Sequence, residues 1–445
     1  VVTLRLLQGR GTIVVVDPRE SETAHLADVH VQLRPGTDPA FLAYVVREAF
    51  RFGVDESAIA PLVRTRSLEE VRSRVMPWTP ERTATVCGVD PDVLEAARDA
   101  LLKGSPVAAA TGTGTAMAPT ANATEWLVWV LALLTGSLDV RGGTVFHPGF
   151  LHPHDRVAPA PAVDSGVRAA TRPELAPVGD SLPAAVLADE ILAGNVRALV
   201  VLGGNPALSL PDSEKARAAL GRLDLLVVGD VRHTETTALA NVVLPLAGQF
   251  ERADLAAGTN QPTGFAQFTR AVVAPVAERR TAAAVFADLA RRLGLHPLGA
   301  GAPPLPDPVT PDAVLGVLAA RARRPWAEIV GAPHGLVVDE ARPGWLLGLL
   351  PRKIDLAPPE LVHRFTAFES LLGSPVRLAL IPRRLPRQVN SAFRDVGMQS
   401  ALGPFPTLLI HPFDAAERGI LDGSVVEVSD DLATVTASAE VTEAI

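Results

Sequence analysis

Two matching segments, far apart in the chain, constrain the fold more than any other feature of the sequence. Each holds an apolar run, an Asp-x-Arg triplet, a Glu-Thr pair, a short Leu-Ala stretch and a second apolar run. The copies span residues 14–29 and 227–242, and the offset from Asp17 to Asp230 holds throughout. Matches kept in one register predict two related structural units, each with a strand, a short helix and a second strand.

Helical patterns alternate with short apolar runs through roughly the first two thirds of the chain. Two of these runs, 107–111 and 197–202, open into the Gly-rich loops at Gly112 and Gly203, as buried parallel strands do at their carboxyl ends. The other elements that we expect are a strand over 12–16 and helices over 91–103, 121–134, 182–193, 212–222 and 282–293. Strands that alternate with helices predict an α/β fold with parallel sheets.

Changes in pattern divide the chain into four parts. We expect two related Rossmann-like α/β units over 1–145 and 146–300, followed by a wrapping segment rich in Pro, Gly and Ala over 301–374. From 375 to 445, short apolar runs separated by turns predict the start of a β-barrel domain. Because the chain opens on Val and closes within a β pattern, we interpret it as a fragment of a longer protein.

Composition excludes several classes of function. The formal net charge is -8 without any Lys/Arg-rich block, which argues against a nucleic-acid partner. The longest apolar run, 126–134, is too short to span a membrane and predicts a buried helix. The single cysteine, Cys87, excludes a disulfide framework and a cysteine-ligated iron–sulfur cluster within these residues, and we expect it to be a small buried residue.

The Gly-rich loops and the Asp-x-Arg triplets together indicate a nucleotide ligand. A Gly loop at the carboxyl end of a parallel strand brings backbone N–H groups close to an anion, although one such loop is equally typical of a tight strand–helix turn. Asp17 and Asp230 end strands where a purine or ribose edge could bind, and Arg19 and Arg232 could pair with phosphate. Structural ion pairs are the alternative for a single copy, whereas two copies favour nucleotide binding.

Further motifs follow one another along nearly the whole chain. They are Asp-Pro-Arg with Arg-Pro-Gly-Thr-Asp (17–19, 34–38), Leu-Thr-Gly-Ser…Gly-Gly (134–143), Gly-Gly-Asn-Pro (203–206), Glu-Thr…Ala-Asn…Val-Leu-Pro (235–245), and Asn-Ser with His-Pro-x-Asp-Ala (390–391, 411–415). In this order they resemble the molybdopterin oxidoreductases related to dimethyl sulfoxide reductase and formate dehydrogenase. Ser137 and Asn241 depart from the Asn and Asp that the family has in the second and fourth motifs.

The resemblance implies a bis-(molybdopterin guanine dinucleotide) cofactor with molybdenum or tungsten, one nucleotide arm for each α/β unit, and a C-terminal barrel of the double-psi type. The residues implied to contact the first arm are Asp17, Arg34, Thr37, Asp38, Gly112 and Gly114. Those implied to contact the second arm are Gly204, Asn205, Pro206, Asp230, Glu235 and Thr236, with Asn390 and Ser391 approaching from the barrel.

The family's residues that hold the metal are expected upstream of this chain. A four-cysteine segment with a [4Fe–4S] cluster and a Cys, selenocysteine, Ser or Asp ligand of the metal would precede the Asp-Pro-Arg strand. We therefore name no catalytic residue and no metal ligand here. His147, His152 and His154 with Asp155 have a spacing that can bind zinc, but their Pro- and Gly-rich setting favours an exposed loop.

The function expected from the resemblance is two-electron oxidation or reduction of a small substrate, formate-dehydrogenase-like as the first choice and a nitrate or sulfur-compound reductase as the next. We expect an iron–sulfur or flavin protein as the electron partner and a cytoplasmic location. One alternative is a non-catalytic relative, such as the large iron–sulfur subunit of respiratory complex I. Another is an unrelated α/β enzyme that uses nicotinamide or thiamine diphosphate, although the sequence lacks the Gly-Asp-Gly magnesium motif of the latter.

Overall fold

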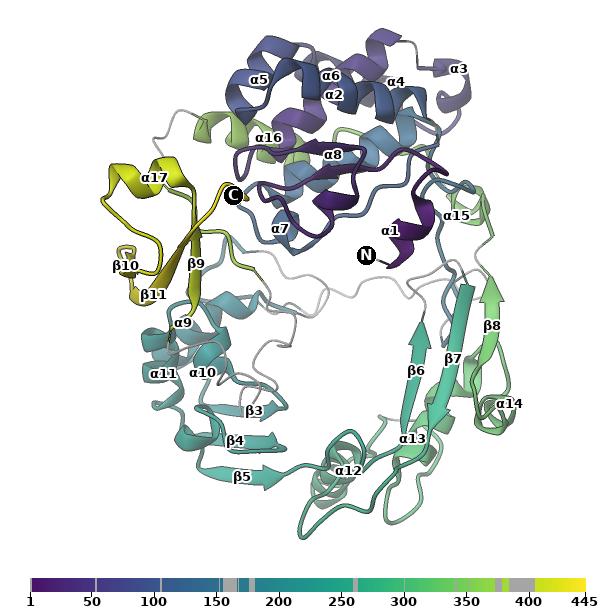
Figure 1. Ribbon diagram of the computed structural model, residues 1–445. Coiled ribbons are helices and arrows are strands. Elements are labelled where there is room, and N and C mark those ends of the chain that lie inside the picture. The colour runs from purple at the N-terminus through teal and green to yellow at the C-terminus, as the bar shows by residue number, and fades with distance from the viewer. Residues whose placement is uncertain are drawn as a thin grey trace. The chain divides into compact units, whose positions relative to one another are not determined.

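The repeat seen in the sequence is also a repeat of structure. In the computed structural model, two pairs of parallel strands fall on the two copies: β1 (Val14–Val16) with β2 (Val29–Val31), and β4 (Leu225–Asp230) with β5 (Val242–Pro245). Val14 lies opposite Val29, and Val227 lies opposite Val242, so both pairs have the same register. Figure 1 shows β4 and β5 side by side in one sheet. This confirms the predicted strand, short helix and second strand in each copy.

The chain divides into two units, one formed by Val1–Phe146 with Arg342–Ile445 and the other by His147–Ala341. The structure describes residues 2–52, 54–104, 106–151, 153–154, 166, 168–175, 181–258, 263–299, 301–340, 342–350, 352–372, 378–383 and 405–445. No helix in these described ranges is both long and apolar enough to cross a membrane.

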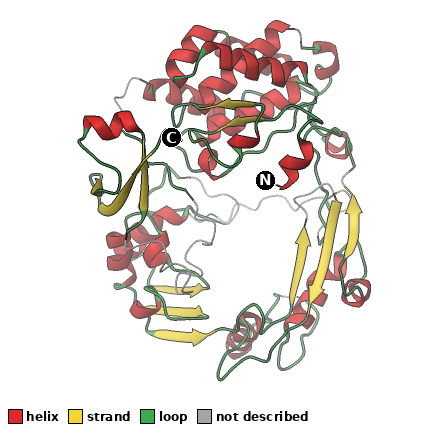
Figure 2. Cartoon of the chain, in the orientation of Figure 1, coloured by secondary structure: helices red, strands yellow, loops and turns green. Residues whose placement is uncertain are grey.

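The first unit is mainly helical, with β1 and β2 forming a small sheet (Figure 2). Its helices are α1 (Val2–Leu7), α2 (Asp38–Phe52), α3 (Glu56–Ile59), α4 (Thr65–Val75), α5 (Pro80–Cys87), α6 (Pro91–Lys103), α7 (Thr113–Ala116), α8 (Ala121–Leu134), α15 (Trp345–Leu349), α16 (Pro359–Leu371) and α17 (Pro412–Glu417), with a 3-10 turn at Ala24–Leu26. Helix α8 is largely apolar and mostly buried, and it packs against α2 and α16.

Local sequence signals set the ends of these helices. Thr79 caps α5, because its Oγ1 accepts a hydrogen bond from the backbone N–H of Arg82 at 3.3 Å, and Pro80 fills the first turn, where no intrahelical donor is needed. Asp90 caps α6 in the same way. Gly88 ends α5 with a φ of 68°, in the left-handed region that glycine adopts readily.

An aromatic cluster joins α16 to the amino-terminal helices of the first unit. The ring of Trp78 stacks on Phe368 at 5.8 Å and meets Phe365 edge-on at 6.2 Å, while Phe365 lies 5.7 Å from Trp126. All four rings are buried. Trp126 also donates from Nε1 to the backbone oxygen of Leu356 at 2.7 Å, so residues far apart in the sequence complete one core.

The last described segment of the first unit forms a three-stranded mixed sheet. Its strands are β9 (Thr407–Ile410), β10 (Val425–Ser429) and β11 (Thr434–Val441), in the order β10-β11-β9, with β11 antiparallel to β10 and parallel to β9. The backbone N–H of Glu20 donates to the carbonyl of Ala444 at 2.9 Å, which ties this segment to the turn after β1. Closure of this sheet into a barrel stays a prediction.

The second unit contains two separate sheets. Strand β3 (Ala198–Leu202) joins β4 and β5 in a parallel sheet, whereas β6 (Asp254–Gly258), β7 (Thr263–Thr269) and β8 (Leu336–Glu340) form an antiparallel one. The helices are α9 (Leu187–Leu192), α10 (Pro206–Ser209), α11 (Ser213–Leu220), α12 (Ala282–Arg292), α13 (Pro311–Leu318) and α14 (Trp326–Gly331), with 3-10 turns at Ala184–Val186, Thr237–Leu239 and Ala319–Arg321. Helices α9 and α11 cover one face of the parallel sheet, where Leu226 and Val228 are buried.

The structure confirms the predicted α/β character with parallel sheets, and the predicted helices over 91–103 and 121–134 match α6 and α8. The strand predicted over 107–111 is wrong, because these residues are mostly exposed and outside any strand. The N–H of Val107 donates to Oγ of Ser137 at 2.8 Å instead of to a neighbouring strand. An apolar run becomes a strand only where another backbone is placed to pair with it.

Truncation of Phe365 should destabilise the first unit strongly. Phe365→Ala empties the centre of the aromatic cluster, and a buried Phe→Ala change costs about 3–5 kcal/mol of unfolding free energy. The matched control is Phe413→Ala, since Phe413 is 67% exposed. Urea unfolding of both variants measures the difference, and an equal effect of the two changes would contradict the proposed role of the cluster.

Candidate functional site

The turn after each repeated strand is closed by its aspartate. Oδ1 of Asp17 accepts from the backbone N–H of Arg19 at 2.8 Å, and its Oδ2 accepts from the hydroxyl of Ser21 at 3.2 Å. In the second copy, Oδ1 of Asp230 accepts from the backbone N–H of Arg232 at 3.3 Å. Both carboxylates therefore lie at the carboxyl end of a parallel strand, where α/β sheets bind ligands.

The departure of Asn241 from the family pattern is neutral for the fold. Oδ2 of Asp28 accepts from the N–H of Ile13 at 2.7 Å, and Oδ1 of Asn241 accepts from the N–H of Leu226 at 2.6 Å. The two hydrogen bonds occupy equivalent places in the two copies. Either side chain supplies the one acceptor oxygen that this position uses, so the exchange of Asp for Asn keeps the contact.

Asp38, Thr37 and Arg34 lie together at the start of α2. Burial raises the pKa of Asp38 above its ordinary value, and the nearby carboxylate of Asp17 raises this pKa further. The Thr37 hydroxyl donates to the carbonyl of Arg34 at 2.6 Å. The carboxylates of Asp17 and Asp38 therefore interact electrostatically in the structure.

Arg34 is held against the end of α5. Its Nη1 donates to the backbone oxygen of Thr85 at 2.8 Å, and a Cβ on Gly88 would lie 2.9 Å from its Nε. Glycine at position 88 therefore makes room for this arginine. Nη1 also donates to the backbone oxygen of Val86 at 3.4 Å, and a guanidinium has five N–H donors in all, so it can make further contacts.

The first Gly-rich loop is exposed. Gly112 precedes α7 and Gly114 lies within it, and a Cβ at either glycine would meet no atom within 4 Å. This loop follows the residues that fail to form the predicted strand. The structure shows no direct contact between this loop and Asp17 or Asp38 among the interactions of the described residues.

The second unit brings its predicted residues into one hydrogen-bonded cluster. Nδ2 of Asn205 donates to Oε2 of Glu235 at 2.8 Å, and Oδ1 of Asn205 accepts from the hydroxyl of Thr236 at 2.7 Å. Gly204 and Pro206 flank Asn205 in the loop that follows β3, while Glu235 and Thr236 follow β4. The two loops therefore meet at the carboxyl ends of adjacent parallel strands.

Glu251 fixes the loop that follows β5. Its Oε2 accepts from the N–H of Gly248 at 2.8 Å, and its Oε1 pairs with Nη1 of Arg279 at 2.7 Å. The Gly248 hydrogen bond lowers the pKa of Glu251 below its ordinary value, and Arg279 lowers it further. Glu251 therefore stays ionised and holds residues 248–251 against 276–280.

Several predicted sites lie partly or wholly outside the described residues. Asn390 and Ser391 are among them, as are His152 and Asp155. Within the described ranges, no group of three or more His, Cys, Asp or Glu residues could hold a metal ion.

Cys87 lies in the core of the first unit, and its thiol donates to the carbonyl of Thr37 at 3.7 Å. Burial raises the pKa of this thiol to about 11. A thiol with so high a pKa stays protonated at neutral pH, and a protonated thiol is a poor metal ligand. Its position agrees with the structural role expected from the sequence.

Sequence reasoning missed Asp139, which is 1% exposed and has a φ of 57°. Its Oδ2 accepts from the backbone N–H groups of Leu346 and Leu347, at 2.9 and 3.1 Å. Asp139 thereby ties the Gly-rich turn after α8 to the start of α15. A carboxylate with a partner this distant in sequence has no local pattern that would reveal it.

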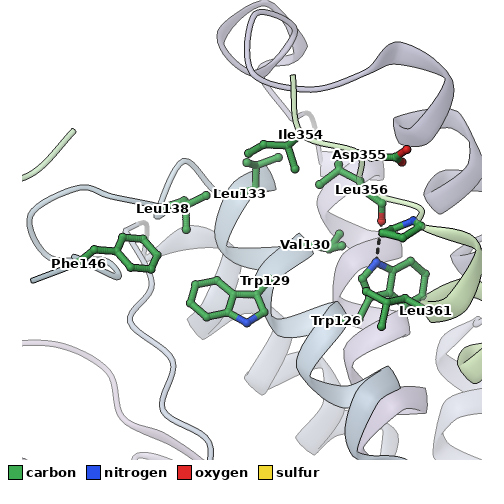
Figure 3. Close-up of a pocket in the computed structure, with 11 residues that line it drawn as sticks. Trp126, Trp129, Val130, Leu133, Leu138, Phe146, Ile354, Asp355, Leu356 and Leu361 are labelled. Atoms are coloured by element: carbon green, nitrogen blue, oxygen red, sulfur yellow. Dashed lines mark hydrogen bonds between the residues drawn. The ribbon is translucent and has the colours of Figure 1, made fainter. Parts of the chain in front are cut away.

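An apolar pocket of about 380 Å³ opens beside α8 (Figure 3). Trp126 and Trp129 line it together with Phe146, which stacks on Trp129 at 5.9 Å between ring centroids. The one carboxylate in the lining, Asp355, is paired with Nη1 of Arg64 at 2.8 Å. A pocket of this chemistry suits neither a diphosphate nor a metal ion, so the nucleotide site is better placed at the strand ends.

Curated relatives match parts of this chain at low identity. A probable oxidoreductase, YoaE of Bacillus subtilis, is 27% identical over 288 residues, covering 63% of this chain and 40% of the relative. The F420-dependent formate dehydrogenase subunit alpha of Methanocaldococcus jannaschii is 28% identical over 308 residues, covering 63% of this chain and 43% of the relative. The chain thus spans well under half the length of these two relatives.

Comparison with solved structures agrees on the fold. Acetylene hydratase from Pelobacter acetylenicus superposes with a TM-score of 0.72 and 19% identity, covering 99% of this chain and 66% of that structure. The molybdopterin oxidoreductase family matches residues 2–292, which include both copies of the repeat, and the molybdopterin dinucleotide-binding domain matches residues 378–445. The resemblance inferred from the motifs is thereby confirmed, and the chain belongs to the molybdopterin oxidoreductase family.

Proposed function

We propose that this chain is the nucleotide-binding part of a molybdenum or tungsten bis-(molybdopterin guanine dinucleotide) oxidoreductase that acts on a small substrate. The observation that carries the proposal is the pair of equivalent strand–turn–strand units, which share one register and equivalent side-chain hydrogen bonds. Two similar nucleotide arms need two similar protein surfaces, and the repeat supplies them.

The second unit fits a diphosphate at the end of β3. Among the described residues, the N–H groups of Gly204 and Asn205 have no backbone acceptor, and Gly203 has a φ of 60° that turns the loop. Backbone N–H groups at such a loop bind phosphate oxygens. Asp230, at the end of β4, would accept from a ribose hydroxyl or a purine edge, with Glu235, Thr236 and Pro206 completing the wall.

The first unit fits the guanine end of the other arm. Guanine presents two adjacent N–H donors, its ring N1–H and its amino group, and a carboxylate accepts both in a bidentate contact. Asp17 and Asp38 share one electrostatic site, where such donors would relieve the repulsion between two carboxylates. Arg19, Arg34 and Thr37 would then contact phosphate or ribose, and the exposed loop of Gly112 and Gly114 would approach the pyrophosphate.

The reaction itself belongs to groups beyond the described residues. The metal, when bound, supplies two-electron redox chemistry, and this chain's residues bind and orient the arms that carry it. Asn390 and Ser391 are proposed to close over the cofactor from the C-terminal domain. We propose a [4Fe–4S] cluster and the metal-ligating residue in other parts of the protein, and an iron–sulfur or flavin partner as electron acceptor.

Formate oxidation is the activity that we propose first. Its support is the 28% identity over 308 residues to a formate dehydrogenase subunit alpha. Reduction of nitrate or of a sulfur compound is the competing activity, and no residue of this chain favours it over formate oxidation.

Metal and pterin analysis of the full-length protein is the direct test. We expect about one molybdenum or tungsten atom per chain together with guanine-containing pterin, in a host that supplies the cofactor. Folded protein without metal or pterin would contradict the proposal and favour a non-catalytic scaffold. Assays with formate, nitrate and sulfoxide then decide the substrate.

Gly204→Ala should weaken binding of the second arm without harming the fold. The added Cβ would meet Val201 Cγ1 at 3.6 Å, an ordinary contact, so stability should change by less than about 0.5 kcal/mol. The methyl group would crowd a diphosphate on this loop, and we expect about tenfold weaker binding of guanosine diphosphate in calorimetry.

Gly229→Ala is the matched control, because its Cβ would lie 2.6 Å from Cδ2 of Leu202 inside the sheet. This variant should lose stability by about 1–3 kcal/mol. Unchanged nucleotide affinity in Gly204→Ala would place the diphosphate elsewhere.

The stability of the first unit should depend on pH through Asp38. Because its pKa is raised, the folded state binds the proton of Asp38 more tightly than the unfolded state does. This carboxyl therefore contributes stability at pH values below its pKa in the unfolded state, and that contribution is lost as pH rises through its pKa in the folded state. The side chain of Asp38→Asn cannot ionise. The free energy of unfolding of this variant should therefore increase relative to that of wild type as pH rises from about 4 to about 7.

Asp55→Asn serves as the control of opposite sign. The Ser57 hydroxyl lowers the pKa of Asp55, so this carboxylate contributes stability that is present at neutral pH and lost in acid. The deficit of Asp55→Asn relative to wild type should therefore shrink as pH falls. Chemical denaturation across this pH range measures the free energy of unfolding of both variants. If the two variants differed from wild type in the same direction as pH changes, the raised pKa of Asp38 would be refuted.

A further inference from the structure

Three side chains link the two loops at the carboxyl ends of β3 and β4. Oδ1 of Asn205 accepts two hydrogen bonds from Thr236, one from its backbone N–H at 3.2 Å and one from its hydroxyl at 2.7 Å. Nδ2 of Asn205 donates to Oε2 of Glu235 at 2.8 Å. Oγ1 of Thr236 in turn accepts from the N–H of Ala207 at 3.1 Å, which closes a ring of hydrogen bonds between the loops.

The side-chain oxygen of Asn205 is used by the protein rather than left for a ligand. This carbonyl oxygen has two lone pairs, and both are used by Thr236. Asn205 is 7% exposed and Thr236 is fully buried. A polar group buried in this way is costly to leave unpaired, so the ring has one stable arrangement.

The ring also determines which backbone N–H groups are free to bind a phosphate. Helix α10 begins at Pro206, which has no N–H, and the N–H of Ala207 is already bound to Thr236. The first turn of α10 therefore offers no free donor from these two residues. The N–H groups of Gly204 and Asn205, one step earlier in the loop, are the donors that the ring presents.

We propose that Asn205 and Thr236 are positioning residues that latch the two loops and so orient the N–H groups of Gly204 and Asn205 toward a phosphate. This inference rests on the proposed nucleotide function and assigns the side chain of Asn205 a role other than ligand contact. We call the ring formed by Asn205, Glu235 and Thr236 the inter-loop latch.

The latch distinguishes the second unit from the first. Thr23 and Glu22 stand at the positions equivalent to Thr236 and Glu235, yet Thr23 is half-buried and Glu22 is exposed. The first unit instead uses the carboxylates of Asp17 and Asp38. The second arm therefore meets a preorganised loop, which lowers the entropy lost on binding, while the first arm is recognised mainly by charge.

The test exchanges the amide and the acid across the latch. Asn205→Asp puts two carboxylates face to face and should open both loops. Adding Glu235→Gln restores the contact in reverse, because the new amide donates to the new carboxylate while the net charge equals that of wild type. Thr236→Val removes the hydroxyl and keeps the shape of the side chain. This variant tests the latch if Asn205→Asp does not fold.

The chain offers a matched control pair in the same unit. Nδ2 of Asn195 donates to Oε2 of Glu190 at 3.0 Å, and Glu190 is buried, before the start of β3 rather than at its carboxyl end. Asn195→Asp, alone and with Glu190→Gln, makes the same chemical exchange away from the loops.

Two readouts are needed: amide hydrogen exchange of peptides spanning 203–209 and 233–239, and the affinity for guanosine diphosphate by calorimetry. We expect Asn205→Asp to speed exchange in both peptides and to weaken affinity, each by about tenfold, as loss of a buried hydrogen bond predicts. The double variant should restore both to within about twofold of wild type. The Asn195 variants should leave both readouts at the loops unchanged.

Other outcomes overturn the inference. Unchanged exchange in both Asn205→Asp and Thr236→Val would show that no latch operates. Restored exchange without restored affinity in the double variant would show that the Asn205 amide contacts the ligand itself. If wild type does not bind guanosine diphosphate, the proposed nucleotide function fails, and the exchange data alone decide whether the latch exists.

Discussion

Parallel pairing of two short strands, closed by one acidic or amide side chain, is the interaction on which the rest of the structure depends. In each copy the side chain at the end of the connecting turn accepts a hydrogen bond from a backbone N–H at the start of the first strand, Ile13 just before β1 or Leu226 within β4. That contact holds the turn in place, and the turn carries the aspartate at the carboxyl end of the strand, Asp17 or Asp230. The register of the strands and the position of the aspartate are thus set by this one side-chain hydrogen bond together with the parallel pairing.

The two units place different structural elements and side chains around this common strand–turn–strand unit. The first surrounds its two strands mainly with helices, as Figure 2 shows, and the carboxylate of Asp17 raises the pKa of Asp38 there. The second adds β3 beside β4 and joins their loops through Asn205. The duplicated framework thus carries different side-chain contacts in its two copies, and under the proposed function these would hold the two cofactor arms in different ways.

Features that depend on interactions within a few residues could be predicted from the sequence, whereas features that depend on contacts between distant segments could not. Helices α6 and α8 were predictable because caps and apolar periodicity act within a few residues. The strand expected over 107–111 failed because pairing needs a partner from elsewhere, and the first N–H of that run goes to Ser137. Asn241, which departs from the family pattern, proved equivalent to Asp28 once its hydrogen bond was visible.

The sequence by itself determined the repeat, the family and the residue types available at the strand ends, because each is a local pattern of side chains along the chain. Only the tertiary structure decided which of those side chains hydrogen-bond to other parts of the protein. Asn205 illustrates the difference, since its side-chain oxygen accepts from Thr236 and its amide nitrogen donates to Glu235, residues that follow a different strand. Such contacts depend on how strands are placed side by side, and that placement is set by packing and backbone pairing over long sequence separations.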